Sequence, residues 1–327
     1  MTMLTMKKTM GLLLAPLVLA GLIFGIKFMT VDKAHHKVDA IAAILLEYAL
    51  THDIDRRSID GAVVENKHCE LEGFDAIRTK IATAVASNNS IKFNLVGFPY
   101  KSQNIEKKVA VAQLDEAEQH SLEYLNTMLE KIADIYPPGA FLTIFTDGMV
   151  FCDLEGVSDE VVIKYEKQLK QLATGMYYIQ IKSLADLLPG KSPAQIRSTI
   201  ESFSPSVAEF EILLATDLKL QEEVSLLEKR MAFEFNHAGS LVQLSQVADI
   251  TKKLIYRGMQ YSAFLSSFRP LEAIRLSVHY QQNVSKKMGI KLSQNSFITP
   301  WHGVLAVDSK GIARIEHLQD VVSRRRA

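Results

Sequence analysis

The chain has 327 residues and carries 37 Lys and Arg against 37 Asp and Glu, so its formal net charge is zero. This balance provides no overall positive field for a nucleic-acid backbone, which argues against a general nucleic-acid binder. A hydrophobic content of 48% fits a globular protein and excludes a disordered or collagen-like chain, and Cys69 and Cys152 are too few for a disulfide framework.

An uncharged apolar leader spans residues 10–26, with lysines on both sides. One interpretation is a marginal membrane anchor, because the segment is at the short limit for a bilayer span. A small-residue cleavage site at 18–20 also suits a secretory signal peptide. A third interpretation is that residues 1–28 reflect a misassigned start, because Met29 begins a plausible soluble N-terminus. We treat residues 1–28 as a segment apart from the domain of residues 29–327.

The periodicity along the chain alternates between helix and strand. Helical spacing of apolar residues predicts helices over residues 39–52, 74–85, 114–133 and 158–172. Short β-rich segments bounded by Gly and Pro predict strands over residues 91–96, 140–145 and 176–181. This order indicates right-handed crossovers and a Rossmann-like, mostly parallel α/β sheet.

The second half of the chain begins with a helical insertion. Strand patterns are absent between residues 187 and 268, which we expect to form a helical subdomain. Strand-like segments return at residues 274–280, 303–307 and 312–315, and the last two flank a turn that predicts a hairpin. The sheet edge is therefore completed late in the sequence.

Several common α/β chemistries lack their sequence motifs. The chain contains no G-x-G triplet, no G-x-x-x-x-G-K-[ST] loop and no G-x-S-x-G elbow. No H-E-x-x-H or cysteine spacing completes a metal site. We therefore predict neither a cofactor nor a metal.

Polar residues follow the first two predicted strands, where ligands of open α/β sheets bind. Lys101, Ser102 and Asn104 form a cationic, donor-rich loop that suits a phosphate or carboxylate, although an ordinary basic surface loop has the same composition. Asp147 and Asp153 follow the next strand and suit acid/base chemistry or hydroxyl binding. Aspartates that stabilise a turn are the alternative.

Two later segments add titratable side chains. Alternation along the strand at 274–280 places Arg275, Ser277 and His279 on one face, which is costly in a half-buried strand unless they have partners. Trp301 and His302 follow a proline turn, and histidine changes charge near neutral pH. Purely structural histidines are the alternative interpretation.

Four segments, taken in order, resemble one family. Residues 98–104 (FPYKSQN), 146–153 (TDGMVFCD), 275–279 (RLSVH) and 299–302 (TPWH) resemble the pyoverdine/dityrosine biosynthesis family, whose bacterial members are isocyanide (isonitrile) synthases. The resemblance extends over residues 39–318.

The resemblance implies a reaction that needs no cofactor. In it, the amino group of an aromatic amino acid, tyrosine or tryptophan, condenses with the ketone of ribulose 5-phosphate, and C2 of the sugar becomes the isonitrile carbon. It also implies a cytoplasmic enzyme of secondary metabolism, of the paerucumarin or pyoverdine kind, with an iron- and 2-oxoglutarate-dependent oxygenase as pathway partner.

The reaction requires clamps for anions, an apolar slot and proton transfer. We hypothesise that His279 and His302 transfer protons, while Asp147 and Asp153 bind the amine or sugar hydroxyls. Substrate-binding residues are expected to be Lys101, Ser102, Asn104, Arg275, Ser277, Phe151 and Trp301.

The sequence departs from the family pattern at three positions. Met149 stands where the family usually has His, Cys152 where it has Ser, and Tyr100 replaces a smaller residue. Because methionine transfers no proton, one alternative is a catalytically altered sugar-phosphate-binding or membrane-tethered interaction protein on the same fold. Another is a different carbon–carbon lyase acting on a phosphosugar.

Overall fold

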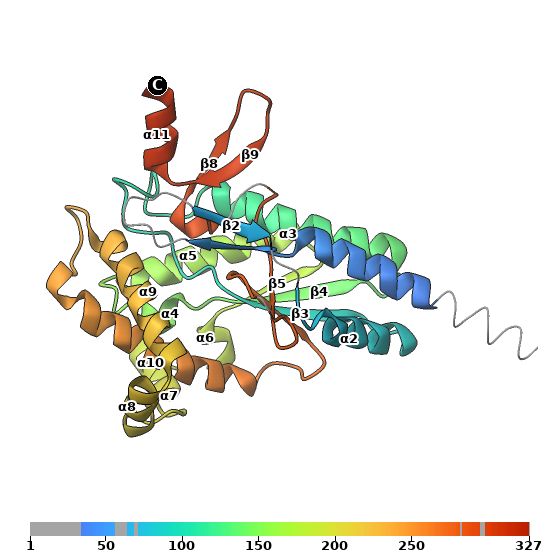
Figure 1. Ribbon diagram of the computed structural model, residues 1–327, viewed down its shortest axis with the longest axis horizontal. Helices are drawn as coiled ribbons and strands as arrows, with labels where there is room; N and C mark the ends of the chain where they lie inside the picture. The colour runs from blue at the N-terminus through green and yellow to red at the C-terminus, as the bar shows by residue number, and fades with distance from the viewer. Residues whose placement is uncertain (1–33, 56–63, 69–70, 282, 295–297, 327) are drawn as a thin grey trace, which may run out of the picture.

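A parallel sheet of five strands forms the centre of the molecule (Figure 1). The computed structural model describes residues 34–55, 64–68, 71–281, 283–294 and 298–326. In the order β5-β4-β3-β6-β7, the strands are β5 (Ile179–Lys182), β4 (Ala140–Phe145), β3 (Ile91–Val96), β6 (Ile274–Ser277) and β7 (Met288–Gly289). This arrangement confirms the predicted α/β class.

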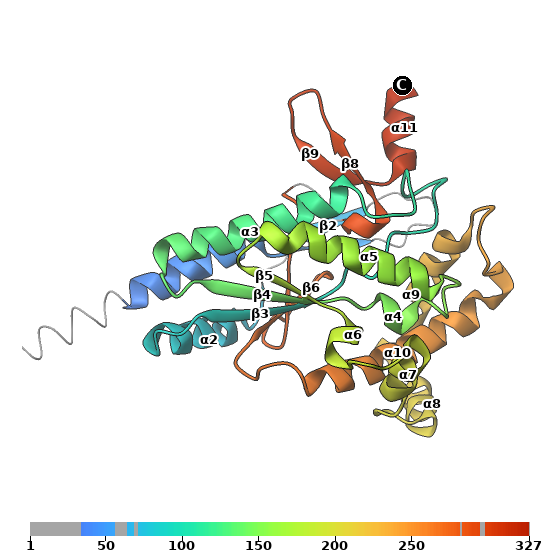
Figure 2. The ribbon, with the colours of Figure 1, turned by 180° about the vertical axis from the view of Figure 1, so that it is seen from behind.

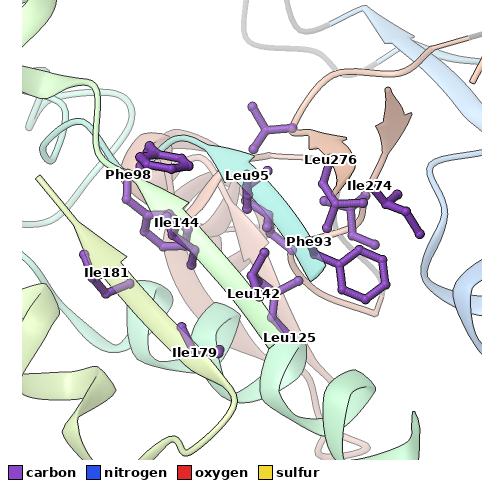
Figure 3. Close-up of a cluster of buried hydrophobic side chains, with 14 of the residues drawn as sticks. Phe93, Leu95, Phe98, Leu125, Leu142, Ile144, Ile179, Ile181, Ile274 and Leu276 are labelled. Atoms are coloured by element: carbon purple, nitrogen blue, oxygen red, sulfur yellow. The ribbon is translucent and has the colours of Figure 1, made fainter. Parts of the chain in front are cut away.

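The central strands are almost continuously apolar because both faces of the sheet are covered. β3 pairs with β4 in parallel from Ile91 opposite Ala140 to Val96 opposite Phe145. Phe93, Leu95 and their neighbours on β4 form a cluster of fully buried side chains (Figure 3). The bounds of both strands agree with the prediction.

Helices cover both faces of the sheet. The helix of residues 34–48, α3 (Glu116–Ile135) and α5 (Asp159–Leu172) lie on one face, and α2 (Phe74–Ala86) lies on the other (Figures 1 and 2). Asp115 caps α3 with a capping box, so that its carboxylate accepts a hydrogen bond from the Ala117 amide at 2.8 Å.

The segment after β5 is helical, as the sequence predicts. It comprises α6 (Leu184–Leu187), α7 (Pro193–Glu201), α8 (Val207–Thr216), α9 (Leu218–Phe235), the 3₁₀ turn η2 (Leu244–Gln246) and α10 (Val247–Ser266). Met231 and Phe235 of α9 pack against Val247 and Leu254 of α10 in a small apolar cluster of their own. α10 then leads into β6 on the far side of β3.

The C-terminal strands form a hairpin apart from the main sheet. β8 (Val304–Val307) and β9 (Ala313–Glu316) pair antiparallel, as predicted, and α11 (Leu318–Arg326) follows them. The late strands of the main sheet are β6 and β7 instead. A second small antiparallel pair, β1 (His52–Asp55) with β2 (Val64–His68), was not predicted.

Three shorter elements complete the chain: α4 (Gly148–Phe151) and two 3₁₀ turns, η1 (Ala173–Gly175) and η3 (Pro300–His302). The apolar leader and Cys69 lie outside the described residues. Within the described ranges, none of the helices combines the length and apolar character that a membrane crossing requires.

Candidate functional site

A cavity of about 550 Å³ opens at the carboxyl ends of β3, β4 and β6. β3 continues through α3 to β4 on one side, whereas its neighbour on the other side is β6, from much later in the chain. Such a reversal of strand order leaves a crevice where ligands of open α/β sheets bind. α9 and α10 form the opposite wall, with Met231, Gly258 and Tyr261 among the lining residues.

The cavity collects residues from all four sequence clusters. Eight of the eleven predicted site residues line it: Ser102, Asp147, Phe151, Arg275, Ser277, His279, Trp301 and His302. Lys101, Asn104 and Asp153 do not line it.

Lys101 is instead sealed inside the protein. Its Nζ atom donates to the Asp115 carboxylate at 2.8 Å, to Glu118 at 2.9 Å and to the Pro300 carbonyl at 2.8 Å. Both Lys101 and Glu118 have side chains with no exposed surface. Lys101 therefore joins the start of α3 to the turn that carries Trp301.

The other two residues support neighbouring segments. The Asn104 side-chain amide donates to the carbonyls of Phe233 and Glu234, both at 3.1 Å, which attaches the loop after β3 to the end of α9. The Asp153 carboxylate accepts a hydrogen bond from Arg257 of α10 at 2.6 Å. Both residues thus hold the helical wall against the strand loops.

Two close backbone approaches shape the mouth of the cavity. A Cβ atom on Gly148 would lie 2.0 Å from the Pro99 carbonyl oxygen, so only glycine fits where α4 begins beside the loop after β3. Phe98 in that loop adopts a left-handed backbone with φ of 60°, which is costly for an aromatic residue. Its ring is fully buried, 5.1 Å from the Trp301 ring, and this packing holds it in place.

Three carboxylates line the cavity, and we call them the carboxylate cluster: Asp147, Glu155 and Glu234. Glu234 accepts hydrogen bonds from Ser102 Oγ and Lys108 Nζ, and its Oε2 atom lies 3.9 Å from His302 Nε2. The other ring nitrogen of His302 lies 2.9 Å from Thr299 Oγ1. These contacts fix the position of the imidazole at the cavity wall.

The other two carboxylates are protonated more easily than usual. Burial raises the pKa of Asp147 to about 7, and its Oδ1 atom is inaccessible and has no hydrogen-bond partner among the described residues. Burial also raises the pKa of Glu155 to about 7, although the hydrogen bond from the Tyr100 hydroxyl opposes this shift. Groups with such pKa values exchange protons readily at neutral pH.

Three cations, Arg269, Arg275 and Lys287, line another part of the cavity, and we call them the cationic group. Burial and the charge of Arg275 lower the pKa of Arg269 to about 10. Burial followed by the charges of Arg275 and Arg269 lowers the pKa of Lys287. All three side chains border the same cavity, and the lowered pKa values of Arg269 and Lys287 reflect neighbouring positive charges as well as burial.

The departures from the family pattern lie around the site. Met149 and Cys152 do not line the cavity; their sulfur atoms lie 3.5 and 3.7 Å from Nη1 of Arg197, which also pairs with Asp159 at 2.7 Å. Burial raises the pKa of the Cys152 thiol to about 12, so it is not a thiolate. Tyr100, in contrast, lines the cavity and bonds Glu155.

Sequence reasoning missed Glu155, Glu234, Arg269 and Lys287. Glu234 lies on a helix among many other charged residues, and only its contacts distinguish it. The described residues contain no group of three or more His, Cys, Asp or Glu side chains placed to hold a metal ion.

Comparison with known proteins identifies relatives along most of the chain. The family model described as pyoverdine/dityrosine biosynthesis protein matches residues 81–238 and 225–327. The chain is 30% identical to the L-tryptophan isonitrile synthase AmbI2 of Fischerella ambigua over 71% of this chain and 72% of that protein. It is also 30% identical to an L-tyrosine isonitrile synthase of Xenorhabdus nematophila over 74% of each chain.

A longer fungal protein and a solved structure are similar as well. The isocyanide synthase xanB of Aspergillus fumigatus is 26% identical over 76% of this chain, which spans only 36% of the fungal protein. The crystal structure of PvcA from Pseudomonas aeruginosa has the same fold, with a TM-score of 0.72, 24% identity and coverage of 87% of this chain and 94% of that one. The chain belongs to the pyoverdine/dityrosine biosynthesis family.

Proposed function

We propose that the protein is an isonitrile synthase that converts an aromatic L-amino acid, tyrosine or tryptophan, with ribulose 5-phosphate. The observation that supports this most directly is the composition of the cavity at the carboxyl ends of the strands. It combines carboxylates with pKa values near 7, a group of cations and aromatic side chains at the carboxyl ends of the strands. A zwitterionic aromatic amino acid and a sugar phosphate together require these three kinds of contact.

The first chemical step is a condensation. The amine nitrogen forms a bond to C2 of the sugar, the amine loses two protons, and the ketone oxygen leaves as water. Asp147 and Glu155 suit this step because carboxyl groups with pKa values about 7 both accept and donate protons at neutral pH.

Later steps retain C2 of the sugar as the isonitrile carbon and release the remaining carbons by elimination and carbon–carbon cleavage. His302 is oriented for proton transfer by Thr299 on one side and Glu234 on the other. His279 lines the cavity at an exposed position, from which it reaches solvent. Phe151 and Trp301 provide the apolar walls for the aromatic ring.

The cellular context follows from the same chemistry. Ribulose 5-phosphate is a cytosolic metabolite, so we propose cytoplasmic activity in secondary metabolism. An isonitrile attached to an amino-acid skeleton is a substrate for further oxidation, for which we propose an iron- and 2-oxoglutarate-dependent oxygenase as pathway partner.

The test uses the purified full chain with ribulose 5-phosphate labelled with ¹³C at C2 and either tyrosine or tryptophan. We expect an organic product with an isonitrile infrared stretch that shifts with the label. The label separates this reaction from other carbon–carbon cleavages of a phosphosugar. Absence of an isonitrile with every aromatic amino acid would contradict the proposal, and thermal stabilisation by the sugar phosphate without turnover would indicate a binding protein.

A further inference from the structure

The cationic group converges on one strand pair from three separate segments. Arg269 lies in the loop between α10 and β6, Arg275 is in β6, and Lys287 directly precedes β7. Asn94 of β3 is the register partner of Arg275, so both side chains leave the sheet on the same face. All four residues line the cavity.

The described part of the chain supplies no ion-pair partner for these three cations. The ion pairs within 4.0 Å include none of Arg269, Arg275 or Lys287. Glu223 is the carboxylate whose charge reaches Lys287, without forming a bridge to it. Like charges gathered without a counter-charge cost free energy, which a bound anion would offset.

Two donors beside the cations also lack partners. Asn94 is only 4% exposed, and its Nδ2 atom is buried without a hydrogen-bond acceptor among the described residues. The Nε atom of Arg269 is in the same situation. A buried donor left unpaired destabilises the folded protein, so a set of such donors is expected where a ligand supplies the acceptors.

We infer that Asn94, Arg269, Arg275 and Lys287 form a subsite for the phosphate of a phosphate monoester. The inference rests on the proposed function for the identity of the sugar. A phosphate monoester brings a charge near −2 and several acceptor oxygens to three cations and an amide donor. The single negative charge of an amino-acid carboxylate would leave two of the three cations uncompensated.

The subsite also orients the sugar. Asp147 follows β4 and Arg275 lies in β6, so the two sets of charged residues lie on opposite sides of β3. A phosphosugar with its phosphate on the cationic group therefore extends across the end of β3 and brings its ketone carbon toward the carboxylate cluster. This orientation matches the condensation at C2.

The test measures binding by calorimetry with the purified full chain and three probes: ribulose 5-phosphate, unphosphorylated ribulose and inorganic phosphate. We expect Arg269→Gln and Lys287→Gln each to weaken ribulose 5-phosphate binding about 10- to 100-fold, as loss of one charged hydrogen bond predicts. Ribulose is expected to bind weakly to all variants alike, and inorganic phosphate to compete with the phosphosugar. Tyrosine or tryptophan binding should stay within about twofold of wild type.

Lys286→Gln is the matched control, because this neighbouring lysine is exposed and does not line the cavity. It should change ribulose 5-phosphate affinity less than about twofold. If Arg269→Gln does not fold, Arg269→Lys keeps the charge and should weaken binding less than Lys287→Gln does.

Unchanged phosphosugar affinity in the folded Arg269 and Lys287 variants would overturn the subsite, whatever the enzyme's activity. Weakened phosphosugar binding in a protein that forms no isonitrile would support the subsite while refuting the proposed function.

Discussion

Two lysine–carboxylate networks begin on the same loop after β3 and differ in what surrounds them. In the sealed network, Lys101 bonds Asp115 and Glu118, and neither Lys101 nor Glu118 has exposed side-chain surface. In the open network, Lys108 bonds Glu234, and both side chains line the cavity. The residue types are alike, so access to the cavity, and not charge, separates a structural network from one that a substrate can reach.

The largest expected effect is on the sealed network. Lys101→Met leaves Glu118 buried without its cation, which should lower the free energy of unfolding by about 3–5 kcal/mol. Burial already raises the pKa of Glu118 to about 7 against the opposing charge of Lys101, and loss of Lys101 raises it further. Guanidinium unfolding at pH 8 measures the change. Lys108→Met should cost less because its site borders the cavity, and equal losses would refute the distinction.

Asp147 gives a pH-dependent test of the cavity side. Its folded pKa of about 7 lies above the usual 3.8, so its contribution to stability is fully present below pH 3.8 and is lost as pH rises through 7. Asparagine does not titrate, so the Asp147→Asn variant does not lose this contribution as pH rises. Its unfolding free energy relative to wild type should therefore increase between pH 4 and pH 8, by up to about 4 kcal/mol. A difference that stays constant with pH would show that the carboxyl group is not perturbed.

Glu234→Gln tests whether the open network serves the reaction. Glutamine keeps one oxygen that accepts from Lys108, but it replaces the other oxygen with an NH2 donor and removes the charge beside Lys108 and His302, so stability should fall by about 1–3 kcal/mol. We expect kcat for isonitrile formation to fall about 10- to 100-fold, with an altered pH profile. Glu222→Gln, on an exposed position of the same helix, is the control. A parallel loss in both variants would remove Glu234 from the mechanism.

The smallest effect is expected at the surface. Lys253 and Asp249 form an exposed pair at 2.8 Å on α10, four residues apart. Lys253→Met should change the free energy of unfolding by about 0.5 kcal/mol or less. Chemical denaturation at low and high salt measures this change. A loss comparable to that of Lys101→Met would show that burial does not determine how much an ion pair contributes to stability.

The strands at the centre of the sheet could be predicted from the sequence because burial on both faces leaves an unbroken apolar pattern. β5 begins at Ile179, later than the predicted residue 176. Tyr177 has the side-chain type of a strand residue but is 79% exposed, and it packs beside Phe141 and Tyr178 on the surface. β-propensity alone does not separate these situations.

The candidate site was only partly predictable for a related reason. The sequence indicated the loop after β3, and Lys101 was expected to bind an anionic substrate there. Lys101 instead bonds three groups at the start of α3 and at Pro300, which the local sequence does not reveal. Arg269 and Lys287 follow no local pattern, and they become notable only when the fold brings them beside Arg275. Long-range partners, which determine these roles, are invisible in local periodicity.

The pairing of β3 with β6 affects how the protein is made. Synthesis proceeds from the N-terminus, so β3 and β4 emerge long before Ile274, the partner of Phe93. Until then one edge of an apolar strand has no neighbour, which invites association with other nascent chains. The length of the helical segment between β5 and β6 thus determines how long the edge of β3 stays unpaired during synthesis. A chain truncated before β6 should aggregate.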